Sequence, residues 1–582
     1  MRSIFQKISI IVYSYFLLLT SVYGEPIGND PKYKDQWYLK PKNSLSDPLS
    51  ACIPCLDIEK AWKYTKGSKF VKTTVIEMEK SLKSVLPTKH PDLIQYNYVN
   101  NQNKKVSVEN ESKHNDNKAI KIIKGPVYGN PTKAAGPMLY HDTQILGLII
   151  AQHNNGIGIK GISPNISEVR LISMEYPGHD PNIEDYESYT EKLTAMNESI
   201  VTQEVNENFF SNVYNCSFAD IKQPNKILTY FNPFFQEATK VGYSLRDGSK
   251  TGSLFVISAG NEGVTYDFPS HPIKNVIIVG AVNNFGKKTA YSNFGEAVEI
   301  FAPSGGVPSG KKYDNDLKDN CLEAWTRFSQ KGDGAHKKRW GLLTASFCPK
   351  DNKISNCDID QLDQEKDTVP CYTEYATGTS MAAPIVTSIA NLMFSINPEL
   401  HARTIKKILI SSAYTLSTKT PQPYQKEIKV VNPESALKAC VDEIVYQWSH
   451  YWEKYFKGNE RDKKIFIDYY DHQNFECIIR TGSSSVRQFV GRDEINMFKE
   501  WMVSLKSLYG KHVVIEINNI QFHSYKDSKL TVNFDQNFYG GKRPLYKDRV
   551  HKTITFCLDS SKTKDSKWWY ICKELSEGYI CN

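Results

Sequence analysis

Long apolar runs are scarce in this sequence of 582 residues. The one candidate lies near the N-terminus, where Arg2 and Lys7 precede "ISIIVYSYFLLLTS" and the small residues Val22 and Gly24 follow. The run is shorter than the roughly 20 apolar residues that a membrane-spanning helix needs. Basic, apolar and small residues in this order are typical of a secretory signal peptide, so we predict a signal over residues 1–24, with a single membrane anchor as the alternative. We therefore expect a secreted or extracytoplasmic protein with no stable membrane anchor after cleavage.

A large excess of charge of one sign is also absent. The chain has 72 Lys and Arg against 64 Asp and Glu, a net charge of +8. Its lysine-rich tracts fall in expected loops rather than on one amphipathic helix. A nucleic-acid partner is therefore not expected.

Paired CxxC motifs are missing, because the twelve cysteines include only one, Cys52 and Cys55. Alone it could be redox-active or half of a metal site, but without a second motif a structural bridge is preferred, since export favours disulfides. Four cysteines are expected to staple one polar stretch: Cys321, Cys348, Cys357 and Cys371. Five are expected to pair largely within the C-terminal part, with one left over: Cys440, Cys477, Cys557, Cys572 and Cys581.

What the chain does have is a series of apolar, β-branched runs such as "TTVIEM", "LFVISAG" and "VIIVGAV", with a helical pattern at "HDTQILGLIIAQ". This alternation predicts an α/β fold with a mainly parallel sheet and helices on both faces. The predicted domain covers residues 25–439. Polar stretches near 94–138 and 307–370 break the pattern, and we interpret them as surface insertions.

The composition changes at about residue 440. Two aromatic helices, "CVDEIVYQWSHYWEKYF" and "GRDEINMFKEWMVSL", are followed by strands such as "KLTVNFDQNFY" and "HKTITFCLD". Helices followed by alternating strands predict a separate α+β domain over 440–582 with a curved antiparallel sheet. Its order weakly resembles the cone-shaped nuclear-transport-factor-2-like fold. That resemblance implies a domain that could hold a small ligand, dimerise or bind substrate.

The segment "ATGTSMAAP" places Ser380 at the expected N-terminus of an apolar helix. Gly378 permits close backbone approach, and Pro384 is expected in the first helical turn, where its missing N–H costs nothing. There the backbone N–H groups and the helix dipole face a bound carbonyl oxygen. A serine that only caps a core helix is the alternative.

A catalytic serine also needs a base and donors for the oxyanion. His141 opens the helix "HDTQILG", and Asn261 follows a buried strand in "LFVISAGNEG". Taken singly, His141 is interpreted as a cap or a surface residue and Asn261 as part of a turn.

Together these segments resemble the subtilisin family of serine proteases. "GTSMAAP" matches the nucleophile motif of that family, "SAGNEG" its oxyanion motif and "HDTQILG" part of its histidine motif, and the likeness extends from about residue 29 to 440. The resemblance implies a secreted serine endopeptidase acting on protein or peptide substrates. Ser380 would attack the scissile carbonyl, His141 would take and return the proton, and Asn261 with the Ser380 N–H would stabilise the oxyanion.

The sequence departs from this family where an aspartate is expected. Glu77 occupies that position, and Asp142 adds a negative charge that is expected to raise the pKa of His141. Glu77 keeps the charge that orients the imidazole, but its arm is longer by about 1.5 Å. The alternative function is therefore a catalytically impaired protein that binds peptides or partners.

The resemblance also implies binding residues. Ser217 and Phe218 would pair with an extended peptide, and Ser258, Ala259 and Gly260 would line a specificity pocket. The loop "NNGIGI" resembles a calcium loop of the family, with Asn154 or Asn155 as weak candidate ligands and a plain turn as the alternative. The chemistry itself is expected to need no cofactor.

Overall fold

The computed structural model describes the chain from residue 29 to residue 581, with gaps. The described ranges are 29–40, 56–79, 90–93, 119–124, 140–175, 210–217, 235–265, 273–284, 286–305, 341–350, 368–422, 425–470, 475–481, 485–509, 513–526, 528–540, 546–559 and 568–581. The predicted signal peptide and Cys52, Cys55, Cys321 and Cys357 lie outside these ranges.

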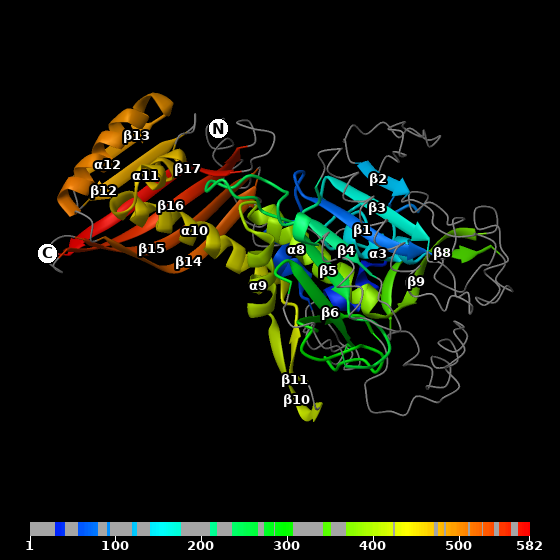
Figure 1. Cartoon of the computed structure of the whole chain (residues 1–582). Helices are drawn as coiled ribbons and strands as arrows, with labels where there is room; N and C mark the ends of the chain where they lie inside the picture. Colours follow the sequence, from blue (N-terminus) through cyan, green and yellow to red (C-terminus); the bar gives the residue numbers. More distant parts are fainter. Residues whose placement is uncertain are drawn as a thin grey trace, which may run out of the picture.

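A nine-stranded sheet forms the larger domain (Figure 1). Its strand order is β10-β11-β7-β6-β5-β4-β1-β3-β2. Every described pairing from β11 to β2 is parallel, and only β10 pairs antiparallel. The predicted mainly parallel α/β fold is therefore confirmed. The bounds are β1 Lys72–Glu79, β2 Ala119–Lys124, β3 Glu168–Glu175, β4 Val213–Cys216, β5 Leu254–Ser258, β6 Val276–Val282, β7 Ile300–Pro303, β10 Tyr414–Gln422 and β11 Gln425–Val430.

Both faces of this sheet are buried, which explains why its central strands read as continuous apolar runs. In β5, Leu254 and Val256 face the core that contains α3 (His141–Ile150) and α8 (Thr379–Ile396). Phe255 and Ile257 face a second cluster on the other side. Within the described residues, this domain also has the helices α2 Ile58–Trp62 and α9 Ala402–Ser411 and short 3₁₀ turns at Tyr33–Asp35 and Trp37–Leu39.

The two predicted insertions contain strands. Within 94–138, β2 extends the main sheet beside β3. Within 307–370, β8 (Leu342–Pro349) pairs with β9 (Thr368–Ala376) in an antiparallel hairpin that the Cys348–Cys371 disulfide closes. Of the four cysteines expected to form disulfides in this stretch, Cys348 and Cys371 are bonded to each other. The sequence pattern did not predict the hairpin that they join.

The C-terminal domain is a six-stranded sheet crossed by α10 (Pro433–Lys457), as Figure 1 shows. The order is β13-β12-β17-β16-β15-β14, and β12 pairs with β17 in parallel, while the other described pairings are antiparallel, as expected. The bounds are α11 Glu460–Asp468, β12 Glu476–Thr481, β13 Ser485–Val490, a 3₁₀ turn at Arg492–Glu494, α12 Ile495–Tyr509, β14 Val514–Lys526, β15 Lys529–Gly540, β16 Tyr546–Asp559 and β17 Trp568–Cys581.

Disulfide pairing in this domain is less extensive than expected. Cys557 and Cys572 join β16 to β17. Cys440 and Cys477 are buried free thiols, so their predicted pairing is wrong. Each packs in the apolar core, where a small thiol fits as a hydrophobic side chain.

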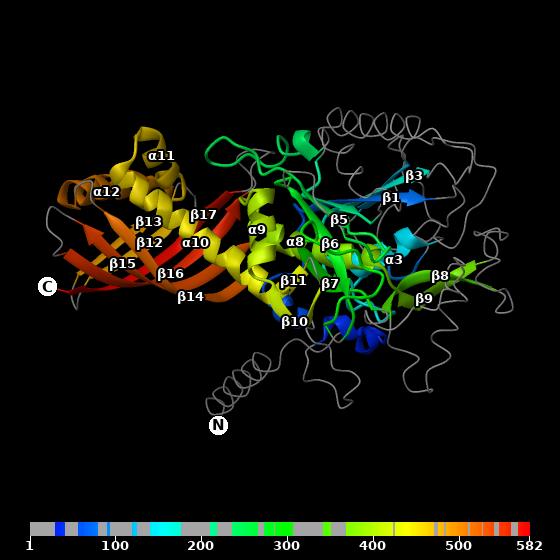
Figure 2. The same ribbon diagram turned by 60° about the horizontal axis from the view of Figure 1, so that its bottom comes forward.

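The two domains share one hydrophobic core, and Figure 2 shows α10 beside both the six-stranded sheet and the larger domain. The predicted boundary at residue 440 lies inside α10, which packs on both α8 and β14. Arg246 of the larger domain pairs with Glu399 at 3.3 Å, and their side chains are 3% and 6% exposed. Both also bond the backbone of Trp569 in β17, Arg246 to its carbonyl and Glu399 to its N–H. The C-terminal domain thus covers a buried ion pair of its neighbour.

Among the described residues, one helix is long and apolar enough to span a bilayer. This is α8, and 94% of its apolar window is buried inside the protein. Burial of that extent is typical of the central helix of a folded domain.

We expect Glu399→Gln to lower the free energy of unfolding by about 3–5 kcal/mol, because the buried guanidinium of Arg246 loses its counter-charge. Urea denaturation measures this, and the shared core predicts one cooperative transition for both domains. Glu237→Gln is the control, because the Lys240–Glu237 pair is exposed and should contribute at most about 1 kcal/mol. Two separate transitions, with the first insensitive to Glu399→Gln, would contradict the coupling.

Candidate active site

Three neighbouring parallel strands end at one edge of the nine-stranded sheet, and each brings a predicted site residue there. Glu77 lies near the end of β1, Ser217 directly follows β4, and Asn261 lies just beyond β5. The carboxyl ends of parallel strands form the edge at which open α/β sheets place ligands.

Glu77 reaches the histidine. The Nδ1 atom of His141 lies 2.6 Å from the Oε2 atom of Glu77, and the two side chains are 16% and 3% exposed. This is the length of a strong, charge-assisted hydrogen bond. A proton held on Nδ1 by the carboxylate leaves Nε2 as the nitrogen that can accept another. The longer glutamate arm therefore does not displace the imidazole from its carboxylate.

The Glu77 side chain is almost fully buried. Its second oxygen, Oε1, is buried and has no hydrogen-bond partner within the described part of the chain. Cys216 is buried nearby, and burial together with the Glu77 carboxylate raises the pKa of its thiol. Cys216 therefore stays neutral beside the carboxylate.

Asp142 follows His141 at the start of α3 and is almost fully buried. Its Oδ1 accepts the Thr143 N–H at 2.5 Å, so the carboxylate bonds a backbone donor of the first helical turn. Its predicted effect on the pKa of His141 stays a prediction.

Ser380 is the second residue of α8, after the N-cap Gly378. Gly378 has φ +105°, a conformation that a side chain rarely adopts. Two buried hydroxyls hold its peptide groups: Tyr291 accepts the Gly378 N–H at 3.0 Å, and Ser304 donates to the Gly378 carbonyl at 2.6 Å. The turn that presents the serine is thus fixed from both sides.

The expected place of Pro384 is wrong. It is the sixth residue of α8 rather than part of the first turn, so its missing N–H would otherwise bond the carbonyl of Ser380. Ser217 supplies the bond instead, donating from Oγ to the Ser380 carbonyl at 2.9 Å. The proline thus leaves the Ser380 carbonyl without its helical donor, and the hydroxyl of Ser217, which directly follows β4, bonds it instead.

This bond also brings the site together. The last pair in the register of β1 and β4 is Ile76 with Cys216, so Glu77 and Ser217 are the next residues along the two neighbouring strands. Glu77 holds His141, and Ser217 holds the backbone of Ser380. The His141 side chain and the Ser380 backbone are therefore hydrogen-bonded to residues at the ends of two adjacent strands, β1 and β4.

Ser217 is itself held by Asn215, whose Nδ2 donates to its Oγ at 2.8 Å. Thr387 of α8 donates to Oδ1 of the same asparagine at 2.9 Å. Asn215 is fully buried, which excludes its Asn-x-Ser sequence as a glycosylation site. No motif in the sequence pointed to Asn215 or Thr387 as supports of the site.

Asn261 is exposed, and its amide orientation is set by Thr379. Its Oδ1 accepts from the Thr379 N–H at 2.8 Å and from the Thr379 hydroxyl at 3.0 Å. An atom that accepts a backbone N–H must be the oxygen, so Nδ2 is the donor on the other side. The amide is thus arranged to donate at the mouth of the site.

The predicted pocket residues are mostly internal. The side chains of Ser258 and Ala259 are 2% and 0% exposed, and Gly260 donates its N–H to Thr379. Ser217 is 2% exposed, and Phe218 lies outside the described residues. Their contact with a substrate stays a prediction.

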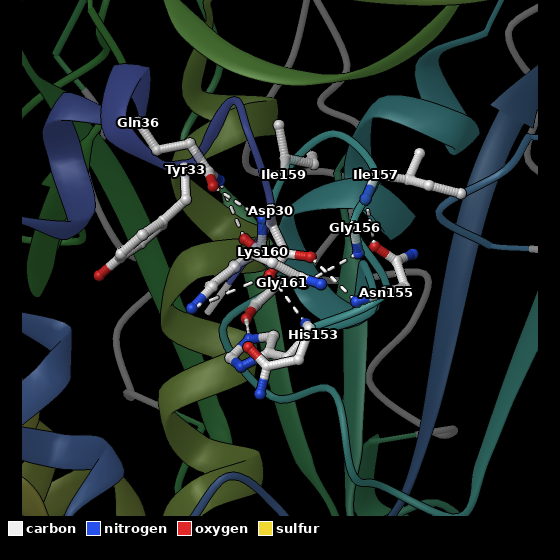
Figure 3. A network of polar contacts seen from close by, with 12 residues as sticks. Asp30, Tyr33, Gln36, His153, Asn155, Gly156, Ile157, Ile159, Lys160 and Gly161 are labelled. Carbon is white, nitrogen blue, oxygen red and sulfur yellow. Dashed lines mark hydrogen bonds and ion pairs between the residues drawn. The ribbon is translucent and has the colours of Figure 1, made fainter. Parts of the chain in front are cut away.

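The loop with Asn154 and Asn155 is held by carboxylates that the sequence analysis missed (Figure 3). Asp30 accepts both backbone N–H groups, at 2.8 and 3.1 Å. Asp92 accepts the Asn155 side chain at 3.2 Å and the Ile159 N–H at 3.1 Å. Burial raises the pKa of Asp92, and the negative charge of Asp30 adds to this.

A cation already lies beside these carboxylates. The Lys160 Nζ atom is 3.9 Å from Asp30 Oδ2 and 4.4 Å from the centre of the Tyr33 ring. Figure 3 shows Lys160 near these two residues. One ammonium does not balance two buried carboxylates. Among the described residues no group of three His, Cys, Asp or Glu side chains could hold a metal, so a metal here would depend on Asp30, Asp92 and the Asn155 amide.

This chain matches the model of one protein family and parts of known proteases. The profile of peptidase S8, the Subtilase family, matches residues 82–432 and so begins after Glu77. A stretch of 200 residues is 26% identical to a thermophilic serine proteinase of Bacillus sp. (strain AK1), covering 33% of this chain and 42% of that protein. A stretch of 188 residues is 25% identical to an extracellular basic protease of Dichelobacter nodosus, covering 31% and 27%. The chain spans less than half the length of these relatives.

Solved protease structures are also among the matches. A protease from Pseudoalteromonas arctica PAMC 21717 aligns with 71% of this chain and 99% of its own, at 21% identity and a TM-score of 0.41. The serine protease of Aeromonas sobria aligns with 71% and 68%, at 18% identity and a TM-score of 0.40.

Ser217→Ala should lower the free energy of unfolding by about 1–3 kcal/mol, because the Ser380 carbonyl loses its donor. Pro384→Ala restores a backbone N–H at the position that bonds this carbonyl. The same Ser217 change should therefore cost about 1 kcal/mol less in the Pro384→Ala background. A double-mutant cycle by urea denaturation measures the difference.

Ser395→Ala is the matched control for this cycle. Ser395 also lies in α8 and donates to a helix carbonyl, that of Asn391, at 2.7 Å. Its cost should be the same with proline or alanine at 384. An equal cost of Ser217→Ala in both backgrounds would show that Ser217 does not replace the missing N–H.

Proposed function

Because this chain belongs to the Subtilase family, we propose that it is a secreted serine endopeptidase whose triad is Ser380, His141 and Glu77. The observation that carries the proposal is the 2.6 Å bond between Glu77 and His141. It supports a glutamate in the role that orients the base and stabilises the imidazolium formed during attack.

In the proposed reaction, His141 Nε2 accepts the Ser380 proton as Oγ attacks the scissile carbonyl, and then returns it to the leaving amine. Negative charge develops on the carbonyl oxygen. The Asn261 Nδ2 group and the Ser380 N–H donate to it, and the first turn of α8 adds its dipole. Thr379 supports this role by fixing the amide of Asn261.

Protein or peptide chains are the proposed substrates. The predicted signal peptide and the extracellular protease among the relatives support secretion. For the C-terminal domain we propose the nuclear-transport-factor-2-like fold, which the helix α10 lying across a bent sheet supports. The alternative for the whole chain is a peptide-binding protein that has lost catalysis, and the bond between Glu77 and His141 weighs against it.

We also propose that a calcium ion is held at the Asn155 loop. The carboxylates of Asp30 and Asp92 are oxygen ligands of the type calcium prefers, and two buried carboxylates with one ammonium leave negative charge to balance. The Asn155 amide would have to turn its oxygen toward the ion, because its nitrogen now donates to Asp92. The ion would keep the N-terminal segment and the loop together.

Labelling with a fluorophosphonate probe tests the triad. The wild type should react and Ser380→Ala should not. Glu77→Gln keeps the shape of the side chain but loses the charge, and labelling should slow by about 10⁴-fold. Glu77→Asp should slow it by about 100-fold, because the shortened arm no longer reaches His141.

Glu237→Gln is the control for these variants, since it removes an exposed carboxylate elsewhere in the domain and should label at the wild-type rate. Equal labelling of wild type and Ser380→Ala would overturn the assignment of the nucleophile. A folded wild type that never reacts would favour the peptide-binding alternative.

Chelation with EDTA tests the calcium proposal. At a calcium concentration 100 times the dissociation constant, the bound ion adds about 2.7 kcal/mol to the free energy of unfolding. We expect EDTA to remove this stabilisation and Asp92→Asn to abolish calcium binding in calorimetry. Identical unfolding curves with EDTA and with calcium would show that Lys160 alone stabilises the loop.

A further inference from the structure

The interior of the C-terminal domain contains a polar cluster between α10 and the six-stranded sheet. Lys552 on β16 and Glu574 on β17 form an ion pair whose side chains are 4% and 3% exposed. Ser576 accepts from Lys552 at 2.8 Å and donates to Glu574 at 2.9 Å. Tyr470 donates to the other Glu574 oxygen at 2.9 Å. This part of the cluster is balanced in charge and well supplied with hydrogen bonds.

Gln536 differs from these neighbours. It is fully buried, and neither its Nε2 nor its Oε1 has a hydrogen-bond partner among the described residues. The indole Nε1 of Trp452 is likewise buried and unpartnered within that part of the chain. Buried polar side chains are normally paired, and a leucine would fill the same place without losing hydrogen bonds to water.

The register of the sheet puts these groups together. On β15, Phe534 and Phe538 flank Gln536 on the same face, because side chains alternate along a strand. The ring of Trp448 lies 5.7 Å from Phe534, and that of Trp452 lies 6.1 Å from Phe538. The two tryptophans are one helical turn apart with ring centres 5.0 Å from each other, so they pack on the phenylalanines that flank Gln536 on the same face of β15.

Lys552 completes the arrangement. It pairs directly with Phe534 across β15 and β16, and its Nζ atom lies 4.5 Å from the Trp452 ring centre. Gln536, Trp452 and Lys552 therefore converge from β15, α10 and β16.

We propose that this cluster is a binding site for a small, uncharged, planar molecule that carries a carboxamide-like group. An adjacent donor and acceptor on the ligand would satisfy both ends of the Gln536 amide, and a second acceptor position would take the Trp452 N–H. A charged ligand is disfavoured, because Lys552 and Glu574 already neutralise each other in a buried place. The aromatic side chains on both sides favour a flat apolar body.

Benzamide is the probe, and the protein is the full chain with Ser380→Ala, so that proteolysis does not interfere. Calorimetry should show saturable binding at one site, accompanied by a rise in Tm. Benzoate, which has the same shape with a negative charge, should bind at least tenfold more weakly. A crystal of the complex should place the amide against Gln536.

Two variants locate the site. Gln536→Leu and Trp452→Phe should each weaken benzamide binding at least tenfold. Gln488→Leu, which changes an exposed glutamine on the edge strand β13, should leave it unchanged. Should Gln536→Leu fail to fold, Trp452→Phe keeps the aromatic ring and still removes the proposed donor.

Binding that survives in both variants would place benzamide elsewhere, including the catalytic site, and would overturn the proposal. Absence of binding, together with a Gln536→Leu protein more stable than its parent, would overturn it too. Fluorophosphonate labelling of the Ser380-containing chain reports on the proposed peptidase independently, so the two proposals fail separately.

Discussion

The hydrogen bond from Ser217 to the Ser380 carbonyl is the contact on which the site depends. Pro384 cannot close the helical bond to this carbonyl, and the hydroxyl that follows β4 closes it instead. One bond therefore joins the first turn of α8 to the end of the sheet. Because Glu77 and Ser217 are the next residues after the last pair that joins β1 to β4, the geometry of the sheet sets the positions of both the serine and the histidine.

Buried hydrogen bonds fix the position of α8 on the sheet further along the helix. Thr387 bonds Asn215, and Asn391 accepts from Thr73 of β1 at 2.8 Å. Apolar packing alone would let a helix slide or rotate slightly on a sheet, whereas directional bonds admit one register. The apolar face of α8 thus stabilises the fold, and its few polar residues align the nucleophile.

The sequence predicted the sheet, α3, α8 and α10, because long apolar or amphipathic patterns are set by burial. It also predicted Ser380, His141 and Asn261, since short motifs place them. It missed Asp30 and Asp92, which lie far apart in sequence and meet only through the Asn155 loop. It misplaced Pro384 because the start of a helix is set by Gly378 and its two hydroxyl partners. The 2.6 Å reach of Glu77 depends on tertiary packing that no local pattern encodes.

The Arg246–Glu399 pair has a consequence for the order of events during synthesis. The backbone of Trp569, which bonds both members of this pair, lies 323 residues after Arg246 in the sequence. Chains fold largely from the N-terminal side as they emerge, yet the larger domain holds two charges that are desolvated only when β17 arrives. Burial of the Arg246–Glu399 pair therefore waits for translation to reach β17, so this part of the larger domain is completed only after the C-terminal sheet has been synthesised.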